Sequence, residues 1–181
     1  METLRTTFLV LAAASVLASD ASAQARARIV ADITENGSAA PGRFVVHGPG
    51  GEEVGRGTCG STVQVAPGTY DVVVYLEGAI DRPEKWTRGL QVSAGATART
   101  TAAFQTGSVE LRVTAGGRRA AATVIVHRAG EDAEAATLGA GVPGVLSAGT
   151  YDFQVRYRAQ EQWLRSEELG TGARRELLVS F

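Results

Sequence analysis

The chain has 181 residues, and 44% of them are hydrophobic, which is enough to bury the core of one domain or of two small ones. Its 18 basic residues are balanced by 19 acidic ones, so the formal net charge is −1. Such a balance provides no field of one sign that would attract nucleic acid or an anionic membrane, and we expect neither as a partner.

The first residues have the features of a secretory signal peptide. Arg5 precedes an apolar run over 8–17, and Ala21-Ser22-Ala23 supplies the small residues that a signal peptidase recognises. We predict that residues 1–23 are removed and that the protein is exported to the periplasm or the extracellular space of a bacterium. The apolar run is too short to cross a bilayer, so we expect no transmembrane segment in the mature chain.

The rest of the chain is an internal repeat. Residues 30–47 align without a gap on residues 110–127, and the motif Gly-Thr-Tyr-Asp at 68–71 recurs at 149–152. Self-similarity on this scale predicts one structural unit that is used twice in tandem.

The alignment between the copies changes its offset at two places. The second copy gains one residue in a middle loop and lacks four residues after the run that contains the repeated tyrosine. Both places are rich in glycine, proline and charged residues, as loops between strands are. We place the two modules at residues 26–104 and 105–181.

Each copy has the pattern of short β-strands. In the second copy, polar residues alternate with Tyr151, Phe153, Val155 and Tyr157, which is the period of a half-buried strand. The other predicted strands of the first copy are rich in β-branched residues and bounded by Gly or Pro: 28–34, 43–47, 53–58, 62–65, 86–92 and 97–104. Seven short strands per copy predict an all-β fold of two tandem Ig-like antiparallel β-sandwich modules.

The repeated Gly-Thr-Tyr-Asp motif is interpreted as a structural staple. The glycine, Gly68 or Gly149, is expected to form a tight turn because glycine accepts a positive φ. The tyrosine, Tyr70 or Tyr151, is expected to bury its ring while its hydroxyl binds a nearby backbone group.

With a sheet-forming run before it and an aromatic-led strand after it, this motif resembles the carboxypeptidase-regulatory-like and transthyretin-like β-sandwich repeats of bacterial secreted proteins, including those found beside von Willebrand factor A domains. The resemblance covers essentially the whole mature chain. It implies transthyretin-like sandwiches that are non-catalytic, and it specifies the fold more than the function.

Motifs for catalysis are absent from the sequence. Residues 55–60 match Gly-x-Gly-x-x-Gly, but a predicted strand follows, where a dinucleotide site needs a helix. No nucleophile elbow, phosphate-binding loop or His-Glu-x-x-His occurs. We therefore predict that the protein is not an enzyme and binds no cofactor.

The histidines and the cysteine suggest little chemistry. His47 and His127 occupy equivalent strand ends, and neither has the neighbouring ligand spacing of a metal site, so we assign no metal ligands. Cys59 is the single cysteine, which we interpret as a loop or buried thiol, with an intermolecular disulfide as the alternative.

One asymmetry between the copies predicts a binding surface. The outer face of the tyrosine strand carries Val73 and Tyr75 in the first copy, whereas the second copy has Gln154 and Arg156 there. An exposed apolar patch is typical of a partner surface, and the partner is expected to be the second module or another protein. Trp86 and Trp163 could form a carbohydrate platform, but their repetition favours core or edge-strand aromatics.

Together these observations predict a non-catalytic exported tandem β-sandwich protein that acts as an interaction or structural module in the periplasm or at the cell surface. The alternative is a small-ligand-binding module, with carbohydrate as the ligand and metal as a weaker candidate.

Overall fold

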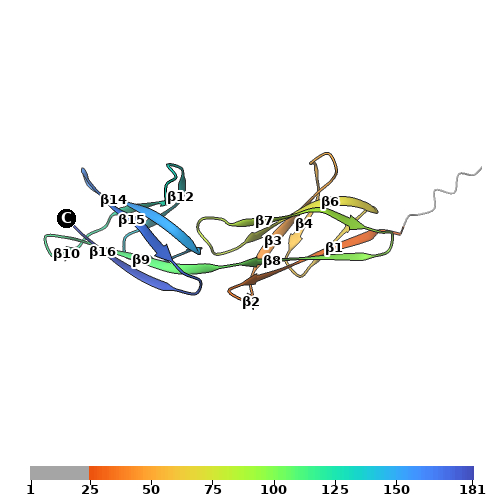
Figure 1. The fold of residues 1–181 in the computed structure, drawn as a ribbon, viewed down its shortest axis with the longest axis horizontal. Coiled ribbons are helices and arrows are strands. Elements are labelled where there is room, and N and C mark those ends of the chain that lie inside the picture. Colours follow the sequence, from red (N-terminus) through yellow and green to blue (C-terminus); the bar gives the residue numbers. More distant parts are fainter. Residues whose placement is uncertain (1–24) are drawn as a thin grey trace, which may run out of the picture.

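The computed structural model describes residues 25–181, and their regular structure consists entirely of β-strands (Figure 1). The predicted all-β class is confirmed. The predicted signal peptide, residues 1–23, lies outside the described residues.

The first copy forms two facing sheets. Its strands are β1 (Ala27–Glu35), β2 (Ser38–Ala39), β3 (Gly42–His47), β4 (Glu53–Thr58), β5 (Thr62–Val65), β6 (Gly68–Leu76), β7 (Glu84–Val92) and β8 (Thr97–Phe104). One sheet has the order β2-β1-β5, with β8 also paired to β1, and the other has the order β4-β3-β6-β7. We call this unit the first sandwich.

The second copy repeats the same topology. Its strands are β9 (Thr106–Ala115), β10 (Arg118–Arg119), β11 (Thr123–Arg128), β12 (Glu134–Gly139), β13 (Gly144–Ser147), β14 (Gly149–Tyr157), β15 (Gln160–Leu169) and β16 (Arg174–Ser180). Its sheets have the orders β10-β9-β13, with β16 on β9, and β12-β11-β14-β15. We call it the second sandwich, and the two lie end to end (Figure 1).

One strand pair in each sandwich departs from the predicted antiparallel arrangement. Strand β8 runs parallel to β1, and β16 runs parallel to β9, whereas all other paired strands are antiparallel. In each case the chain leaves one sheet after β7 or β15 and enters the opposite sheet beside its first strand. Alternation of apolar residues reports which face of a strand is buried, but not the direction of its neighbour.

Each sandwich has its own hydrophobic core between its sheets. Side chains such as Ile29, Phe44 and Val72 fill the first core, and Leu111 and Tyr151 belong to the second. Two residues cross this division. Val145 of the second sandwich packs against the first core, and Ile80 of the first copy packs against the second core.

The tyrosine of the repeated motif behaves as predicted in both copies. The Tyr70 hydroxyl donates to the Ala66 carbonyl at 2.7 Å, and the Tyr151 hydroxyl donates to the Ser147 carbonyl at 2.8 Å. These bonds fix the corner that precedes β6 or β14 to the core.

The predicted role of the motif's glycine is wrong. Gly68 and Gly149 begin strands β6 and β14, and neither has a positive φ. The tyrosine lies over the glycine, and a Cβ atom at Gly68 would lie 3.4 Å from the Tyr70 hydroxyl oxygen, which is an ordinary van der Waals distance. Neither the backbone nor the packing at this position therefore requires a glycine.

Candidate functional site

The aspartate of the repeated motif stabilises a β-bulge in the first sandwich. The Asp71 carboxylate accepts hydrogen bonds from the Arg88 guanidinium at 2.7 Å and from the Gly89 backbone N–H at 2.8 Å. The pairing of β6 with β7 shifts register between Tyr70 and Val72, and Gly89 has a φ of 67°. The side chain thus binds the extra residue of the bulge.

The second sandwich has the same bulge with one change. The Asp152 carboxylate accepts hydrogen bonds from Arg165 and from the Ser166 N–H, each at 2.8 Å. Ser166 has a φ of 56°, so a serine holds the left-handed conformation that Gly89 holds in the first copy. This conformation is strained for a residue with a Cβ atom.

We predict opposite effects of exchanging these two residues. Ser166→Gly should raise the free energy of unfolding of the second sandwich by about 1 kcal/mol, and Gly89→Ser should lower that of the first by a similar amount. The shift of the urea midpoint measures both changes. A Ser166→Gly protein that is no more stable than the wild type would show that this backbone carries no strain.

Arginine, tryptophan and histidine side chains continue from each of these aspartates. The Arg88 guanidinium lies 3.9 Å from the centre of the Trp86 ring, whose centre is 5.4 Å from that of the His47 ring. The Trp86 Nε1–H donates to Glu84 at 2.9 Å, which fixes the indole. We call the set of Asp71, Arg88, Trp86 and His47 the first polar–aromatic row.

The second polar–aromatic row has equivalent members, namely Asp152, Arg165, Trp163 and His127. Arg165 lies 3.7 Å above the Trp163 ring, and the His127 and Trp163 ring centres are 5.4 Å apart. Sequence analysis noted the repeated histidines and tryptophans without connecting them. The repetition of Trp-x-Arg at 86–88 and 163–165, together with the repeated aspartate, was the available signal.

The ionisation of the rows is that of a structural network. The hydrogen bond from Arg88 is the main cause that lowers the pKa of Asp71, and the hydrogen bond from the Ser166 N–H is the main cause that lowers the pKa of Asp152. Both carboxylates are therefore held in their charged form as hydrogen-bond acceptors. A general acid would need the opposite shift.

The histidines occupy strand ends as predicted. His47 Nδ1 lies 3.1 Å from the Gly51 carbonyl oxygen, and His127 Nδ1 lies 3.1 Å from the Asp132 carbonyl oxygen. A carbonyl only accepts, so Nδ1 carries the proton in both rings. Within residues 25–181 no cluster of three histidine, cysteine or acidic side chains is arranged to hold a metal ion.

The tryptophans are poorly placed to bind sugar rings. Trp86 is 40% exposed, but the Arg88 guanidinium covers one face of its indole. Arg165 covers Trp163 in the same way. A carbohydrate that stacks on that face would have to displace the arginine from both the ring and the aspartate.

The predicted binding residues Val73 and Tyr75 differ in accessibility. Val73 is 0% exposed, with Val45 and Trp86 as its cross-strand neighbours, so a partner cannot contact it in this conformation. Tyr75 is half-buried, and the Arg43 guanidinium lies 5.0 Å from the centre of its ring. Of the two, only Tyr75 is available to a partner, and its role in binding stays a prediction.

The two sandwiches are joined by polar contacts that sequence analysis missed. The Thr106 N–H donates to the Asn36 side-chain oxygen at 2.9 Å, and the Asn36 amide donates back to the Thr106 carbonyl at 3.1 Å. The Thr106 hydroxyl also donates to Glu35. Asn36 and Gly37 have φ values of 51° and 84°, so they form a turn after β1, and the Asn36 side chain also anchors the linker.

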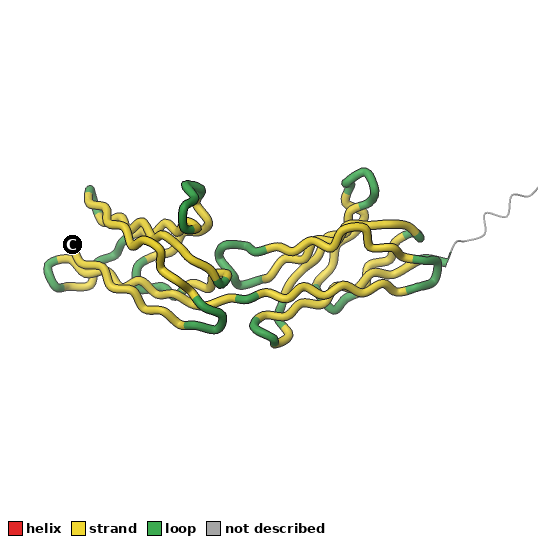
Figure 2. The backbone as a smooth tube through the Cα atoms, viewed as in Figure 1, coloured by secondary structure: helices red, strands yellow, loops and turns green. Residues whose placement is uncertain are grey.

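A loop of the first sandwich reaches the second sandwich. It connects β6 to β7 and extends toward the second sandwich in the backbone trace (Figure 2). Its Asp81 side chain is 0% exposed and lies 3.1 Å from the Arg128 guanidinium. Neither Val73 nor Tyr75 takes part in the hydrogen bonds between the sandwiches.

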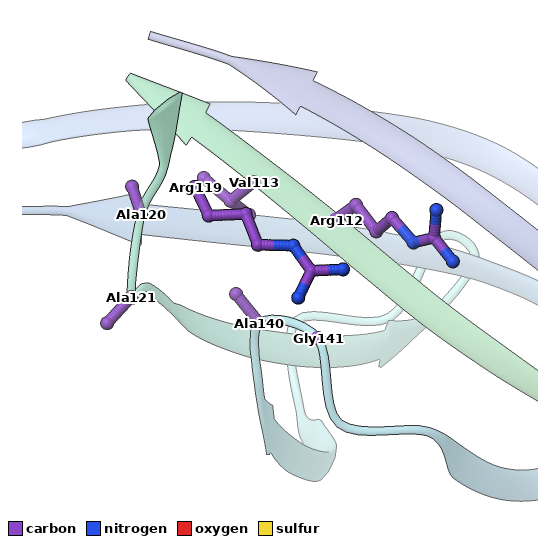
Figure 3. Close-up of a pocket in the computed structure, with 7 residues that line it drawn as sticks. All are labelled: Arg112, Val113, Arg119, Ala120, Ala121, Ala140 and Gly141. Atoms are coloured by element: carbon purple, nitrogen blue, oxygen red, sulfur yellow. The ribbon is translucent and has the colours of Figure 1, made fainter. Parts of the chain in front are cut away.

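A hollow of about 290 Å³ lies near the far end of the second sandwich, lined by small side chains and two arginines (Figure 3). Arg112 is neutralised by Glu110 at 3.3 Å and by Glu176 at 3.0 Å. The Arg119 side chain points toward Ala140 and Gly141 and makes no ion pair within residues 25–181.

Cys59 is a partly buried thiol in the first sandwich. Burial raises the pKa of this thiol, and the nearby carboxylates of Asp32 and Glu77 raise it further. A thiol with a raised pKa is a weak nucleophile, in agreement with the loop-thiol interpretation. Pairing with a second chain remains untested.

Comparisons with known proteins give fold-level likenesses only. No protein-family model matches the chain, and no curated protein matches it, so the resemblance to carboxypeptidase-regulatory-like repeats remains a prediction. Among solved structures, a candidate adhesin from Bacteroides ovatus is 9% identical with a TM-score of 0.41, covering 84% of this chain and 87% of that one.

Two further solved structures are similar at the same level. A candidate cell adhesion protein from Bacteroides ovatus ATCC 8483 is 10% identical with a TM-score of 0.37, covering 83% of this chain and 91% of that one. The TIE protein of Bacillus anthracis is 13% identical with a TM-score of 0.34 over 84% of this chain. The present chain spans only 34% of the TIE protein structure.

Proposed function

We propose that the chain is a non-catalytic exported protein in which the modules 26–104 and 105–181 act together as one elongated interaction or structural unit, in the periplasm or at the cell surface. The observation that carries this proposal is the set of contacts between the two sandwiches, which we call the joint. The hydrogen bonds that Asn36 and Asp81 accept from the Thr106 and Ser147 N–H groups of the second copy hold the two units end to end. A fixed pair of sandwiches presents its loops and sheet edges at a defined spacing.

The polar groups of the chain support this assignment. The charged members of both polar–aromatic rows form hydrogen bonds to the backbone and to each other. The Asp81 carboxylate, which lies between the two sandwiches, likewise accepts a hydrogen bond from the backbone. A catalytic site needs polar groups that converge on an open space, with reactive partners left for a substrate. Within residues 25–181, no helix is long and apolar enough to span a membrane.

The alternative function is binding of a small ligand. The hollow beside Arg119 favours it, because the arginine has no ion pair within residues 25–181 and the neighbouring side chains are small. An acidic carbohydrate is the ligand class that this combination would suit. Metal binding has no comparable support.

Capture from the envelope of the source bacterium tests the proposal. We expect residues 24–181 to retain a partner that Tyr75→Ser loses, since Tyr75 is the accessible member of the predicted surface. Arg156→Ser is the matched control, because Arg156 occupies the equivalent position in the second copy. N-terminal sequencing of the protein from that fraction should begin at Gln24.

Other outcomes discriminate between the two functions. Equal capture by both variants would remove Tyr75 from the binding surface. Retention of an acidic glycan that Arg119→Ala abolishes would favour the small-ligand alternative. A full-length N-terminus in the cytoplasmic fraction would contradict export.

A further inference from the structure

We propose that the second sandwich carries a binding site for an extended segment in which an apolar residue precedes an aspartate, and that residues Gly78–Pro83 of the same chain fill it. We call these residues the donor loop. The receptor site consists of five residues of the second sandwich: Arg128, Gly144, Val145, Ser147 and Tyr151. The first sandwich thereby completes the second with a loop, and the second sandwich has no equivalent loop to offer the first.

The backbone of the donor loop extends a sheet of the second sandwich. Strand β13 lies at the edge of the sheet β10-β9-β13. Ala79 forms a parallel bridge with Val145, and the Ile80 N–H donates to the Val145 carbonyl at 2.8 Å. An exposed strand edge offers such unpaired groups to any extended segment, and main-chain pairing of this kind is a common mode of peptide recognition.

The side chain of Ile80 fills a space that the second sandwich leaves open. A Cβ atom on Gly144 would lie 2.8 Å from the Ile80 Cδ1 atom, so a larger residue at this position would force the isoleucine side chain to shift. In the second sandwich, Gly144 pairs with Val109. The first sandwich has Val63 at the position of Gly144, and Val63 pairs with Ile29, which is the counterpart of Val109.

In the first sandwich the same space is filled from within. Val63 belongs to the first core, and a Cβ atom on Gly55 would lie 2.5 Å from its Cγ1 atom. The first sandwich is therefore closed by its own valine, whereas the second depends on an isoleucine from its neighbour.

The aspartate of the donor loop occupies a cradle of three donors. The Ser147 N–H lies 3.2 Å from the Asp81 carboxylate oxygens, the Tyr151 hydroxyl donates at 3.3 Å, and Arg128 donates at 3.1 Å. Because the carboxylate is fully buried, these partners replace its hydration and select an acidic residue. At the position of Arg128 the first copy has Gly48, which cannot neutralise a carboxylate.

The direction of the interaction follows from loop length. The first copy has four more residues than the second after the tyrosine strand, and the donor loop contains this surplus. The second copy turns tightly between β14 and β15, with Arg158 at a φ of 53°. The second sandwich therefore has a receptor site but no donor loop.

A double-mutant cycle in the mature chain tests the apolar part of the site. We expect Ile80→Ala and Gly144→Val each to accelerate hydrogen exchange in β11–β14 by about tenfold or more, while β1–β6 stay protected. The double variant should exchange more slowly than either single one, because the added valine fills the space as Val63 does. Additive losses, or equal losses in both sandwiches, would overturn the one-way dependence.

A peptide experiment tests the site as a receptor. The full mature chain with Ile80→Ser and Asp81→Asn is titrated with a synthetic peptide of residues 76–85 (LEGAIDRPEK), up to roughly 1 mM because a tethered segment reaches such effective concentrations. We expect the peptide to restore exchange protection to β13 and β14. The same peptide with asparagine in place of its aspartate should bind about tenfold more weakly.

The controls separate this result from loss of folding. The peptide should leave the exchange of wild-type protein unchanged, because the donor loop already occupies the site. Failure of the peptide to protect β13 and β14 in the variant, or equal binding of both peptides, would overturn the proposal. This inference shares the Asp81 contact with the proposed function, but its outcome does not depend on any external partner, so a failure of partner capture and a failure of peptide binding are distinguishable.

Discussion

Replacement of Asp152 by alanine is expected to lower the free energy of unfolding of the second sandwich by about 2–3 kcal/mol. The carboxylate accepts hydrogen bonds from the Ser166 N–H and from Arg165, and its side chain is only 8% exposed. Hydrogen bonds to a charged group contribute about 1.5–3 kcal/mol, and their loss leaves a left-handed serine without its anchor. The Arg165 guanidinium would also lose the contact that holds it over Trp163.

The matched substitution in the first sandwich should cost less. Asp71→Ala removes the equivalent bonds, but this side chain is 33% exposed and water can replace part of what is lost. We expect a smaller cost than for Asp152→Ala, also because Gly89 adopts its left-handed conformation without strain. In a Trp86→Phe background, the fluorescence of Trp163 during urea denaturation reports the unfolding of the second sandwich. In a Trp163→Phe background, the fluorescence of Trp86 reports the unfolding of the first.

The substitutions Asp71→Ala and Asp152→Ala also give a test at acid pH. The pKa of Asp152 is lowered in the folded protein, chiefly by the Ser166 N–H, so its stabilisation is present above the unfolded pKa of 3.8 and is lost as the pH falls through the folded pKa. Asp152→Ala should therefore reduce the loss of stability below about pH 4. Equal costs for Asp71→Ala and Asp152→Ala, or an unchanged acid response, would contradict this account of the bulge.

Strand positions could be predicted well from this sequence because burial alternates along each strand. The predicted limits of 53–58, 62–65 and 97–104 agree with β4, β5 and β8. The tyrosine corner was also within reach, because the motif is local: Tyr70 binds a carbonyl four positions away. Local geometry and periodicity are the information that one sequence displays openly.

The contacts between the two sandwiches could not be predicted in the same way. The Asp81 carboxylate meets Ser147 across 66 positions, and Asn36 meets Thr106 across 70. Alternation does not identify such partners, and it could not show that Trp86 covers Val73. The available signal was the loop after the tyrosine strand, which is four residues longer in the first copy. Its length alone indicates an insertion that a loop tolerates and does not identify what the loop contacts.

Alkaline pH is expected to destabilise the second sandwich between about pH 10 and pH 12, through Tyr151. Burial, and next the neighbouring Asp81 carboxylate, which repels a second negative charge, together raise the pKa of Tyr151 from an ordinary value of 10.0 to about 12. A raised pKa means that the folded state favours the protonated hydroxyl. The stabilisation is fully present below pH 10 and is lost as the pH rises through the folded pKa.

The amount of stability that is lost at alkaline pH is set by the shift in the pKa of Tyr151. A shift from 10.0 to about 12 corresponds to on the order of 2–3 kcal/mol lost at high pH. Tyrosinate absorbance and urea midpoints at a series of pH values measure the ionisation and the stability together. Tyr151→Phe should be less stable than the wild type at neutral pH, because the hydroxyl binds Ser147, but its stability should change less between pH 10 and pH 12.

Asp81→Asn provides the control that connects this titration to the joint. Removing the carboxylate charge should lower the pKa of Tyr151 toward 10, so that the second sandwich loses less stability at high pH and the loss is complete at a lower pH. If Asp81→Asn left the tyrosine titration unchanged, the donor loop would not occupy the cradle in solution. If Tyr151→Phe kept the full alkaline loss, another group would be responsible. The predicted pair of shifts requires Asp81 to lie beside the buried Tyr151, and the contact between the two sandwiches is what brings the two side chains together.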